Sequence, residues 1–466
     1  MHRDAPHLPS APSPSMRADP PADLAVAGML AGADGPQELA ERIAAVNREL
    51  ARWDSNGGLA HWQPGPGLDP RAAAALKDYL AACLALPAWA EPDRIARAES
   101  LFMDMSMLSC TLLFCASLPE CYVLPDLSAV LHAAGQLEAH TDYRVRATAA
   151  MIFPVMLAGG LTASEGAGVA QALKVRLIHA TIRHLILRGS PEDSLGAGPV
   201  RPLLPAGGGI YHTLYAHGWD TARNGLPCNQ EELAYTLLTF HYVFLRSLRK
   251  LGLGLERKDE EDYLHAWNVL GHMLGIEHSL MPETMAQAQQ AFADIQAHGR
   301  DLVRAPDPRP ALAAALMGAM EDEIELRLFK PFPTLLTRHL CGRDASADLG
   351  LNKRQPLLSR LLFTGGLALV RAIDATVRLV VPGFSISRML TRAFGYRLVT
   401  RFLMEQTRPL RLPDALLGQV QDALGQWRHD PRAPRWMNRL EAKLAGHGAP
   451  PAAHASADAD ADKRAA

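Results

Sequence analysis

The chain has 466 residues, 48% of them hydrophobic, and this length and composition are sufficient to bury a large core. Its formal net charge of −2 lacks the basic excess of a nucleic-acid-binding protein, so we expect no nucleic-acid partner. The six cysteines include no C-x-x-C pair and are too sparse for a disulfide scaffold, which favours a reduced, cytoplasmic environment.

Residues 1–35 are rich in Pro, Ala and Asp and lack periodicity, so we predict a disordered N-terminal tail. Neither a signal-peptide core nor a twin arginine can be read there, which agrees with a cytoplasmic location. Two uncharged runs, 105–119 and 147–164, resemble membrane segments. The first is too short to span a bilayer and the second is interrupted by Pro154, so we expect no transmembrane segment.

Helical patterns follow this tail. Apolar and polar residues alternate at helical spacing over 37–53 and 70–86, and the stretch 94–118 becomes increasingly apolar along one predicted helix. Thr141 or Asp142 can cap the helix that comes next.

The run RLIHATIRH, residues 176–184, lies in the following predicted helix. Thr162 and Glu165 form a capping-box pattern before it, and Gly189 follows its end. Asn229 and Glu232 repeat the capping pattern ahead of a helix that we expect to stop at Gly252.

The remaining patterns are also helical. A helix is predicted over 259–274, and several more over about 308–444, while the Val-rich stretch 379–381 is too short to indicate a sheet. We therefore predict an all-α fold, with one catalytic domain over 36–446 and a disordered C-terminal tail over 447–466.

His179 has a distinctive place in the 176–184 run. At roughly 100° per residue, Arg176 and Arg183 lie about 60° and 40° from His179 around the helix, whereas His184 lies about 140° away. The face of His179 is otherwise apolar, with Ala172, Val175, Ile182 and Ile186. Such a face suits a planar, apolar cofactor that carries two carboxylates.

Two interpretations of His179 remain open at this point. A core histidine that is hydrogen-bonded to a backbone carbonyl is the ordinary one. The flanking guanidinium groups of Arg176 and Arg183 favour the other, because they depress the basicity of the imidazole and leave it as a neutral ligand. Haem propionates would neutralise both arginines.

Arg144 and Thr148 form a second candidate group. They stand four residues apart, so they share a helix face, and the apolar residues Met151, Ile152 and Val155 follow. The pair is either the wet end of a core helix or a polar gate above an apolar pocket.

His265 and His272 form a third group, seven residues apart and nearly eclipsed on a helix. With Asp262 they could hold a non-haem metal, although a solvated or hydrogen-bonded helix face accounts for them better. H-E-x-x-H, P-loop, dinucleotide and G-x-S-x-G motifs are all absent, which excludes the common zinc-protease, nucleotide and serine-hydrolase chemistries.

Taken together, these segments resemble the rubber oxygenase family, which comprises the latex clearing proteins and the MpaB-type oxygenases. The resemblance rests on KVRLIHATIRHLIL at 174–187, on Arg144 and Thr148, on NQEELAYTLLTFHYVFLRSLRKLGL at 229–253 and on EEDYLHAWNVLGHMLGI at 260–276. It implies a globin-like all-α core that holds one haem b, with additional N- and C-terminal helices.

The resemblance also implies roles for individual residues. His179 matches the proximal iron ligand, and Arg144 and Thr148 match a polar pair near the haem pocket. In such enzymes ferrous haem binds dioxygen, and both oxygen atoms enter a carbon–carbon double bond of a polyisoprenoid, which yields an aldehyde and a ketone. Two positions depart from latex clearing proteins: Ala147 replaces a lysine, and residues 124–134 offer only Asp126 in place of a distal glutamate.

The leading hypothesis is therefore a haem b-dependent oxygenase that acts with dioxygen on an apolar small molecule or polymer, such as an isoprenoid. His179 would ligate the iron, Arg176 and Arg183 would bind the propionates, and Arg144 and Thr148 would form the polar edge of the pocket. The alternative is a non-catalytic helical protein that binds haem or lipid on the same fold.

Overall fold

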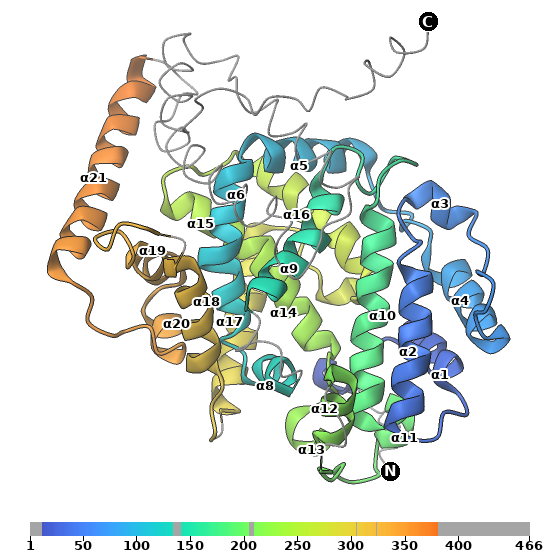
Figure 1. The fold of residues 1–466 in the computed structure, drawn as a ribbon. Coiled ribbons are helices and arrows are strands. Elements are labelled where there is room, and N and C mark those ends of the chain that lie inside the picture. Colours follow the sequence, from blue (N-terminus) through green and yellow to red (C-terminus); the bar gives the residue numbers. More distant parts are fainter. Residues whose placement is uncertain (1–11, 134–140, 205–208, 304, 323, 381–466) are drawn as a thin grey trace, which may run out of the picture.

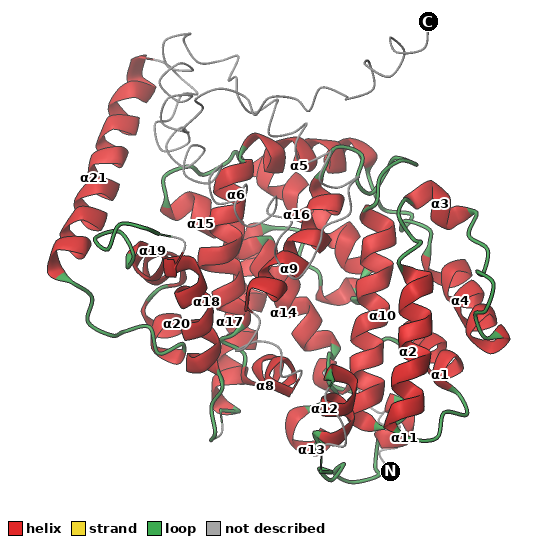
Figure 2. Ribbon diagram, viewed as in Figure 1, coloured by secondary structure: helices red, strands yellow, loops and turns green. Residues whose placement is uncertain are grey.

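The computed structural model describes residues 12–133, 141–204, 209–303, 305–322 and 324–380. Figure 2 shows only helices and loops in these ranges, apart from an isolated bridge between Val200 and Trp219. The prediction of an all-α fold is confirmed. The apolar residues of most helices join one continuous core.

The first five helices each bring apolar side chains to this core: α1 (Pro20–Leu30), α2 (Pro36–Leu50), α3 (Asn56–Ala60), α4 (Pro70–Cys83) and α5 (Pro92–Asp104). All of them except α3 begin with proline. Proline suits this position because the first helical N–H has no partner within the helix, so its loss costs nothing. Helices α2 and α4 match the predicted ranges closely.

Helix α1 corrects the prediction of disorder over the described part of 1–35, whereas residues 1–11 and the predicted tail over 447–466 lie outside the described residues. It packs against α4 and α10 (Figure 1), and Ala22, Val26 and Met29 are buried. The sequence concealed α1 because its apolar residues point in several directions and show no helical periodicity. Its acidic residues Asp19 and Asp23 are also buried, where arginines of α10 pair with them.

The predicted helix over 94–118 is not one helix. The chain bends by 87° between α5 and the helical stretch Leu108–Cys121. This stretch comprises α6 (Ser106–Leu112), a π-helical turn (Leu113–Ser117) and α7 (Leu118–Cys121). At the bend the Ser109 hydroxyl donates a hydrogen bond of 3.1 Å to the Phe102 carbonyl, which the end of α5 leaves without a helical partner.

Within the described ranges, no single helix is long and apolar enough to cross a bilayer. One bent pair of helices, Pro92–Asp104 with Leu108–Cys121, has the length and composition of a broken membrane span.

Helices α8 (Pro125–Ala133), α9 (Thr141–Met156) and α10 (Gly168–Leu187) come next, and α9 and α10 lie side by side (Figure 1). The predicted capping box of Thr162 and Glu165 is wrong, since α10 begins at Gly168 without a cap from its own chain neighbours. Instead Asn56 of α3 accepts a hydrogen bond of 3.1 Å from the Val169 N–H. The N-terminus of α10 is thus capped by a residue that is remote in sequence and not by a neighbour.

The remaining helices complete the molecule: α11 (Pro191–Ser194), α12 (Ile210–Ala216), α13 (Thr221–Asn224), α14 (Gln230–Phe240), α15 (Tyr242–Lys250), α16 (Arg257–Met273), α17 (Met285–Asp301), α18 (Arg309–Asp322), α19 (Phe332–Cys341), α20 (Arg343–Asp348) and α21 (Leu357–Val380). Short 3₁₀ turns lie at Pro14–Met16 and His278–Leu280. The predicted cap of α14 is confirmed, because Asn229 accepts a hydrogen bond of 2.9 Å from the Glu232 N–H.

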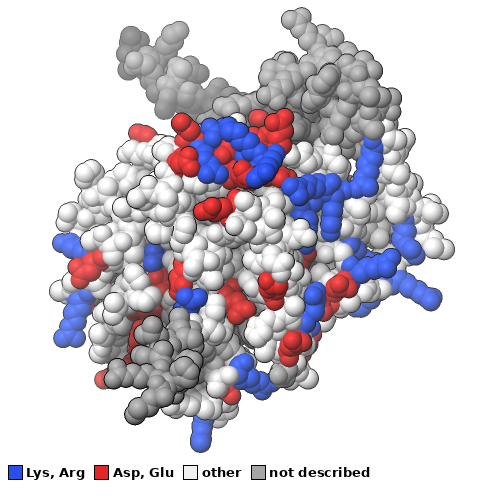
Figure 3. Space-filling view, turned by 180° about the vertical axis from the view of Figure 1, so that it is seen from behind, with Lys and Arg blue, Asp and Glu red and all other residues white. Residues whose placement is uncertain are grey.

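Charges of both signs are mixed on the rear face of the molecule, with the densest group near the top of Figure 3. Ion pairs account for much of this mixing. Arg94 and Arg97 of α5, for example, both pair with Asp262 of α16, at 2.7 and 2.6 Å.

His241 marks the break between α14 and α15, where one continuous helix was predicted. The break lets Phe240 stack on Trp267 at 5.7 Å while Tyr242 packs on Phe292 at 5.3 Å. The His241 side chain is fully buried, and neither ring nitrogen has a hydrogen-bond partner among the described residues. Burial lowers its pKa to about 3, so the ring is neutral in the folded protein.

We therefore expect the His241→Leu variant to resist acid better than the wild type. As the pH falls below about 6.5, the unfolded imidazole binds a proton that the folded one refuses down to about 3, so the folded state loses stability. This loss is up to about 1.4 kcal/mol per pH unit, or about 2 kcal/mol between pH 6.5 and 5. Denaturant unfolding at pH 7 and pH 5 measures the difference.

The exposed His61 provides the control for this experiment. His61→Leu is expected to keep the acid sensitivity of the wild type. Equal pH dependence in the His241 variant and the wild type would contradict the neutral, buried state of His241.

Candidate functional site

His179 lies on α10, a helix that packs against α1, α9 and α16. Its Nδ1 atom is buried and has no hydrogen-bond partner among the described residues. Within the described residues, no backbone carbonyl therefore accepts a hydrogen bond from Nδ1. Burial, assisted by the positive charge of Arg183, lowers the pKa of His179 to about 4. The imidazole is therefore neutral at physiological pH and retains a lone pair for a ligand.

Arg183 lies almost completely inside the protein, with 1% of its surface exposed. Its Nε donates to Asp23 Oδ1 at 3.1 Å, and its Nη1 donates to the Cys228 carbonyl at 3.1 Å. Its Nη2 is buried and has no partner within the described part of the chain. One guanidinium donor beside His179 is thus left for an anion.

Arg176 is held more completely than Arg183. Its Nε and Nη2 donate to the two carboxylate oxygens of Asp19, at 2.6 and 2.7 Å. Burial lowers the pKa of Arg176, but the hydrogen bonds and charge of Asp19 outweigh it, so the net shift is upward. The pairing of both arginines with α1 was not predicted, because no sequence pattern links residues 157 and 160 positions apart.

Asp23, the ion-pair partner of Arg183, is strongly desolvated. Burial raises its pKa to about 6, although Arg183 and the Asp19 N–H act in the opposite direction. Asp19 donates this N–H to Asp23 Oδ2 at 3.0 Å. The two carboxylates and two guanidinium groups therefore form one buried charge cluster between α1 and α10.

Gly275 closes this cluster from the end of α16. Its φ of +85° is in the left-handed region, and a Cβ there would lie 2.3 Å from Asp19 Oδ2 and 2.7 Å from Arg176 Nε. We expect Gly275→Ala to destabilise the fold by at least about 1 kcal/mol more than the same change at a left-handed glycine in open space, because the ion pair must move. Thermal unfolding measures this difference.

Gly252 is the matched control, since its φ is +77° and no heavy atom lies within 4 Å of the position that a Cβ would take. Gly252→Ala is expected to cost about 1–2 kcal/mol from backbone strain alone. Equal losses at Gly252 and Gly275 would show that the Asp19–Arg176 pair tolerates displacement.

Arg144 and Thr148 both belong to α9, as predicted, one helical turn apart. Thr148 is partly buried, and the apolar Ile152 and Val155 that follow it are buried. The side chain of Arg144 lies outside the described residues. The structure thus places this pair on α9, the helix that packs beside the helix of His179.

The third candidate group does not form a metal site. Asp262 is committed to Arg94 and Arg97, and His265 Nε2 accepts a hydrogen bond of 3.0 Å from the Glu91 N–H. The shared face of the two histidines is confirmed, since Trp89 contacts the rings of His265 and His272 at 5.7 and 6.1 Å. Within the described ranges no group of three His, Cys, Asp or Glu side chains is placed to bind a metal.

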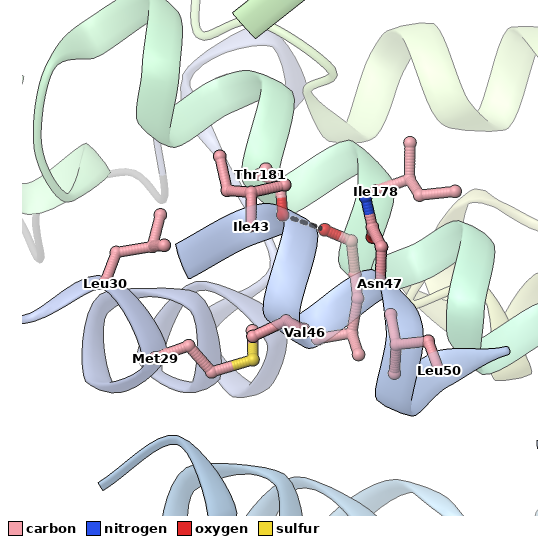
Figure 4. Close-up of a pocket in the computed structure, with 9 residues that line it drawn as sticks. Met29, Leu30, Ile43, Val46, Asn47, Leu50, Ile178 and Thr181 are labelled. Atoms are coloured by element: carbon pink, nitrogen blue, oxygen red, sulfur yellow. Dashed lines mark hydrogen bonds between the residues drawn. The ribbon is translucent and has the colours of Figure 1, made fainter. Parts of the chain in front are cut away.

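A small cavity lies on the opposite side of α10 from His179 (Figure 4). Leu177, Ile178 and Thr181 line it from α10, and Met29, Leu30, Ile43, Val46, Asn47 and Leu50 line it from α1 and α2. Leu177 and Thr181 lie roughly 160° from His179 around the helix. The cavity volume of about 20 Å³ holds about one water molecule, so this cavity is a packing defect and not a cofactor site.

Comparison with known proteins identifies an oxygenase family. The family described as "ER-bound oxygenase mpaB/B'/Rubber oxygenase, catalytic domain" matches residues 112–372, a range that includes Thr148, His179 and Arg183. The chain is 26% identical to the rubber oxygenase of Streptomyces sp. strain K30 over 336 residues, and this matched region covers 69% of each protein.

A solved structure of a latex clearing protein in the closed state has the same fold. It superposes with a TM-score of 0.58 and 20% sequence identity, covering 90% of this chain and 91% of the other. The family match spans more than half of the chain and includes the helices that carry the candidate site. The protein therefore belongs to the MpaB and rubber oxygenase family, a family of oxygenase enzymes.

Proposed function

We propose that this protein is a haem b-dependent oxygenase that uses dioxygen on an apolar isoprenoid or lipid-like substrate. Oxidative cleavage of the carbon–carbon double bonds of polyisoprene is the specific reaction that we propose to test. The proposal depends above all on His179, whose buried imidazole is neutral and has an Nδ1 atom without a partner among the described residues. The rubber oxygenase of Streptomyces sp. strain K30, the relative named above, supports the choice of substrate.

The side chains around His179 fit a haem. A neutral imidazole is the form that ligates iron, and the free Nη2 of Arg183 suits a propionate oxygen. Arg176 would contribute to the same charge balance, although Asp19 already occupies two of its donors. Bound haem would supply the iron and the redox chemistry that activates dioxygen.

The protein would orient and protect this centre. Ala172 and Ile186 lie on the same face of α10 as His179 and are fully buried. They would exclude water from the surroundings of a haem bound to His179. Arg144 and Thr148 would form the polar edge of the pocket from α9. The six free cysteines are all buried and unpaired with one another, in keeping with the cytoplasmic location that we propose.

One set of spectra tests the cofactor. The protein is purified after expression with an adequate haem supply, and its absorption is recorded in the oxidised and reduced states and after conversion to the pyridine haemochrome. We expect a Soret band and about one haem b per chain. Absence of haem, together with tight lipid binding, would instead support the non-catalytic binding protein.

A second experiment tests the reaction. Short polyisoprenoids are incubated with the purified protein under ¹⁸O-labelled dioxygen, and the products are identified by mass spectrometry. We expect an aldehyde end and a ketone end, each carrying one labelled oxygen atom. A product labelled at a single oxygen atom, with the carbon chain intact, would contradict cleavage and indicate a different oxygenation.

A further inference from the structure

Helix α21 exposes a stripe of large apolar side chains. Leu357, Leu358, Leu361 and Leu369 are each between 57% and 73% exposed. At roughly 100° per residue they fall within an arc of about 120° on one side of the helix. Contiguous exposed apolar surface of this kind is uncommon in a protein that contacts only water.

The other side of α21 attaches it to the molecule. The Ser359 hydroxyl donates to the Leu328 carbonyl at 2.8 Å, and the Phe363 ring contacts Phe332 of α19 at 5.6 Å. Arg371 also donates a hydrogen bond to the Lys250 carbonyl at the end of α15. Figure 1 shows α21 standing at one edge of the molecule, beyond α19. The leucine stripe therefore faces outward, and the helix contacts the rest of the molecule through Ser359, Phe363 and Arg371.

Positive charge accompanies the stripe. Helical spacing places Arg360, Arg371 and Arg378 within roughly 20° of one another, beside the leucines. Residues 357–411 contain nine arginines and two acidic residues, a net charge of +7, whereas the whole chain has −2. The charge of this part of the sequence is thus opposite in sign to that of the remainder.

We propose that α21 is an interfacial helix that binds the surface of a membrane containing anionic lipids. Its leucines would enter the boundary between headgroups and acyl chains, and the exposed Arg360 beside them would contact the lipid phosphates. The apolar stretch Leu357–Leu369 is too short to span a bilayer, so the helix would lie in the plane of the membrane. This proposal does not depend on haem, but it would place the enzyme where apolar substrates dissolve.

Charge also distinguishes this partner from the other surfaces that could cover the leucines. The six arginines of residues 381–411, with Glu405 as the only acid, would be repelled by those of α21 if the two segments packed together. A second copy of α21 would bring the same positive charges face to face. Anionic lipid headgroups complement both the apolar stripe and the arginines.

Vesicle co-sedimentation of the full chain tests the proposal. We expect the protein to sediment with vesicles of phosphatidylcholine and phosphatidylglycerol, less at high salt, and weakly with phosphatidylcholine alone. Leu361→Glu should weaken the partition into anionic vesicles by at least about tenfold, because it removes a leucine that enters the membrane and brings a negative charge to the anionic headgroups. Leu24→Glu, at a leucine of α1 that is 73% exposed, is the matched control and should bind as the wild type does.

Two results would overturn the proposal. The first is a wild-type protein that does not sediment with anionic vesicles; if the Leu361 variant then also unfolds earlier or changes its oligomeric mass, α21 is covered by protein instead. The second is equal binding of the Leu361 and Leu24 variants. The Soret band of each variant is recorded in parallel, so that loss of membrane binding is distinguished from failure of the haem assignment.

Discussion

The His179→Ala variant is expected to lose the Soret band and all measurable oxygenase activity. The imidazole is the proposed axial ligand, and alanine offers the iron no atom to bind. Burial already keeps this imidazole neutral, which is the form that binds iron. Its removal would therefore remove the main attachment of the cofactor. Absorption spectra of the purified variant, with haem content measured per chain, check this result.

Added imidazole provides a more specific readout for the same variant. The free base can enter the space that the side chain vacates, so it should restore part of the Soret band. His184→Ala is the matched control, because His184 lies on the same helix about 140° from His179 and is partly buried. A Soret band that is unchanged in His179→Ala, or lost equally in His184→Ala, would refute His179 as the ligand.

The second large effect concerns the buried ion pair between α1 and α10. We expect Asp19→Ala to lower the free energy of unfolding by about 3–5 kcal/mol, because it leaves the guanidinium of Arg176 buried without its partner. The side chains of Asp19 and Arg176 are only 4% and 10% exposed, so water cannot replace the lost carboxylate. Chemical denaturation at neutral pH gives the value.

The Arg17–Glu277 ion pair serves as the control. Its side chains are 26% and 35% exposed, and pairs of this kind contribute about 0–1 kcal/mol. Glu277→Ala should therefore change stability little. If Asp19→Ala were as mild as Glu277→Ala, α1 would not be anchored through this pair, and Arg176 would be free to bind a propionate.

Most helices could be predicted because their signals are local. The periodicity of α2 and α4 and the cap of Asn229 on α14 depend on residues within a few positions of one another. The bends at Met105 and His241 could not be predicted, since each depends on what packs against the chain. At His241 it is the stacking of Phe240 on Trp267 and of Tyr242 on Phe292 that decides the geometry.

The candidate site divides in the same way. Helical spacing correctly placed Arg183 near His179, but burial is the larger cause of the lowered pKa of His179, Arg183 is the second, and Arg176 does not contribute. Spacing could not show that Arg183 donates hydrogen bonds to Asp23 and to the Cys228 carbonyl. Nor could it show that Asp262 forms ion pairs with the arginines of α5. These partners lie far away in sequence, and only close packing reveals them.

The sequence by itself determined that the protein is all-α and that one helix presents a histidine between two arginines on an apolar face. Both properties follow from the 3.6-residue period of the α-helix, which any stretch of chain displays on its own. Only the tertiary structure decided the charge state and the hydrogen bonding of these groups. Within the described residues, the buried Nδ1 of His179 and the Nη2 of Arg183 have no partner. The acids Asp19 and Asp23 pair with the two arginines. Burial and pairing are properties of the assembled core, because desolvation depends on every element that surrounds a group.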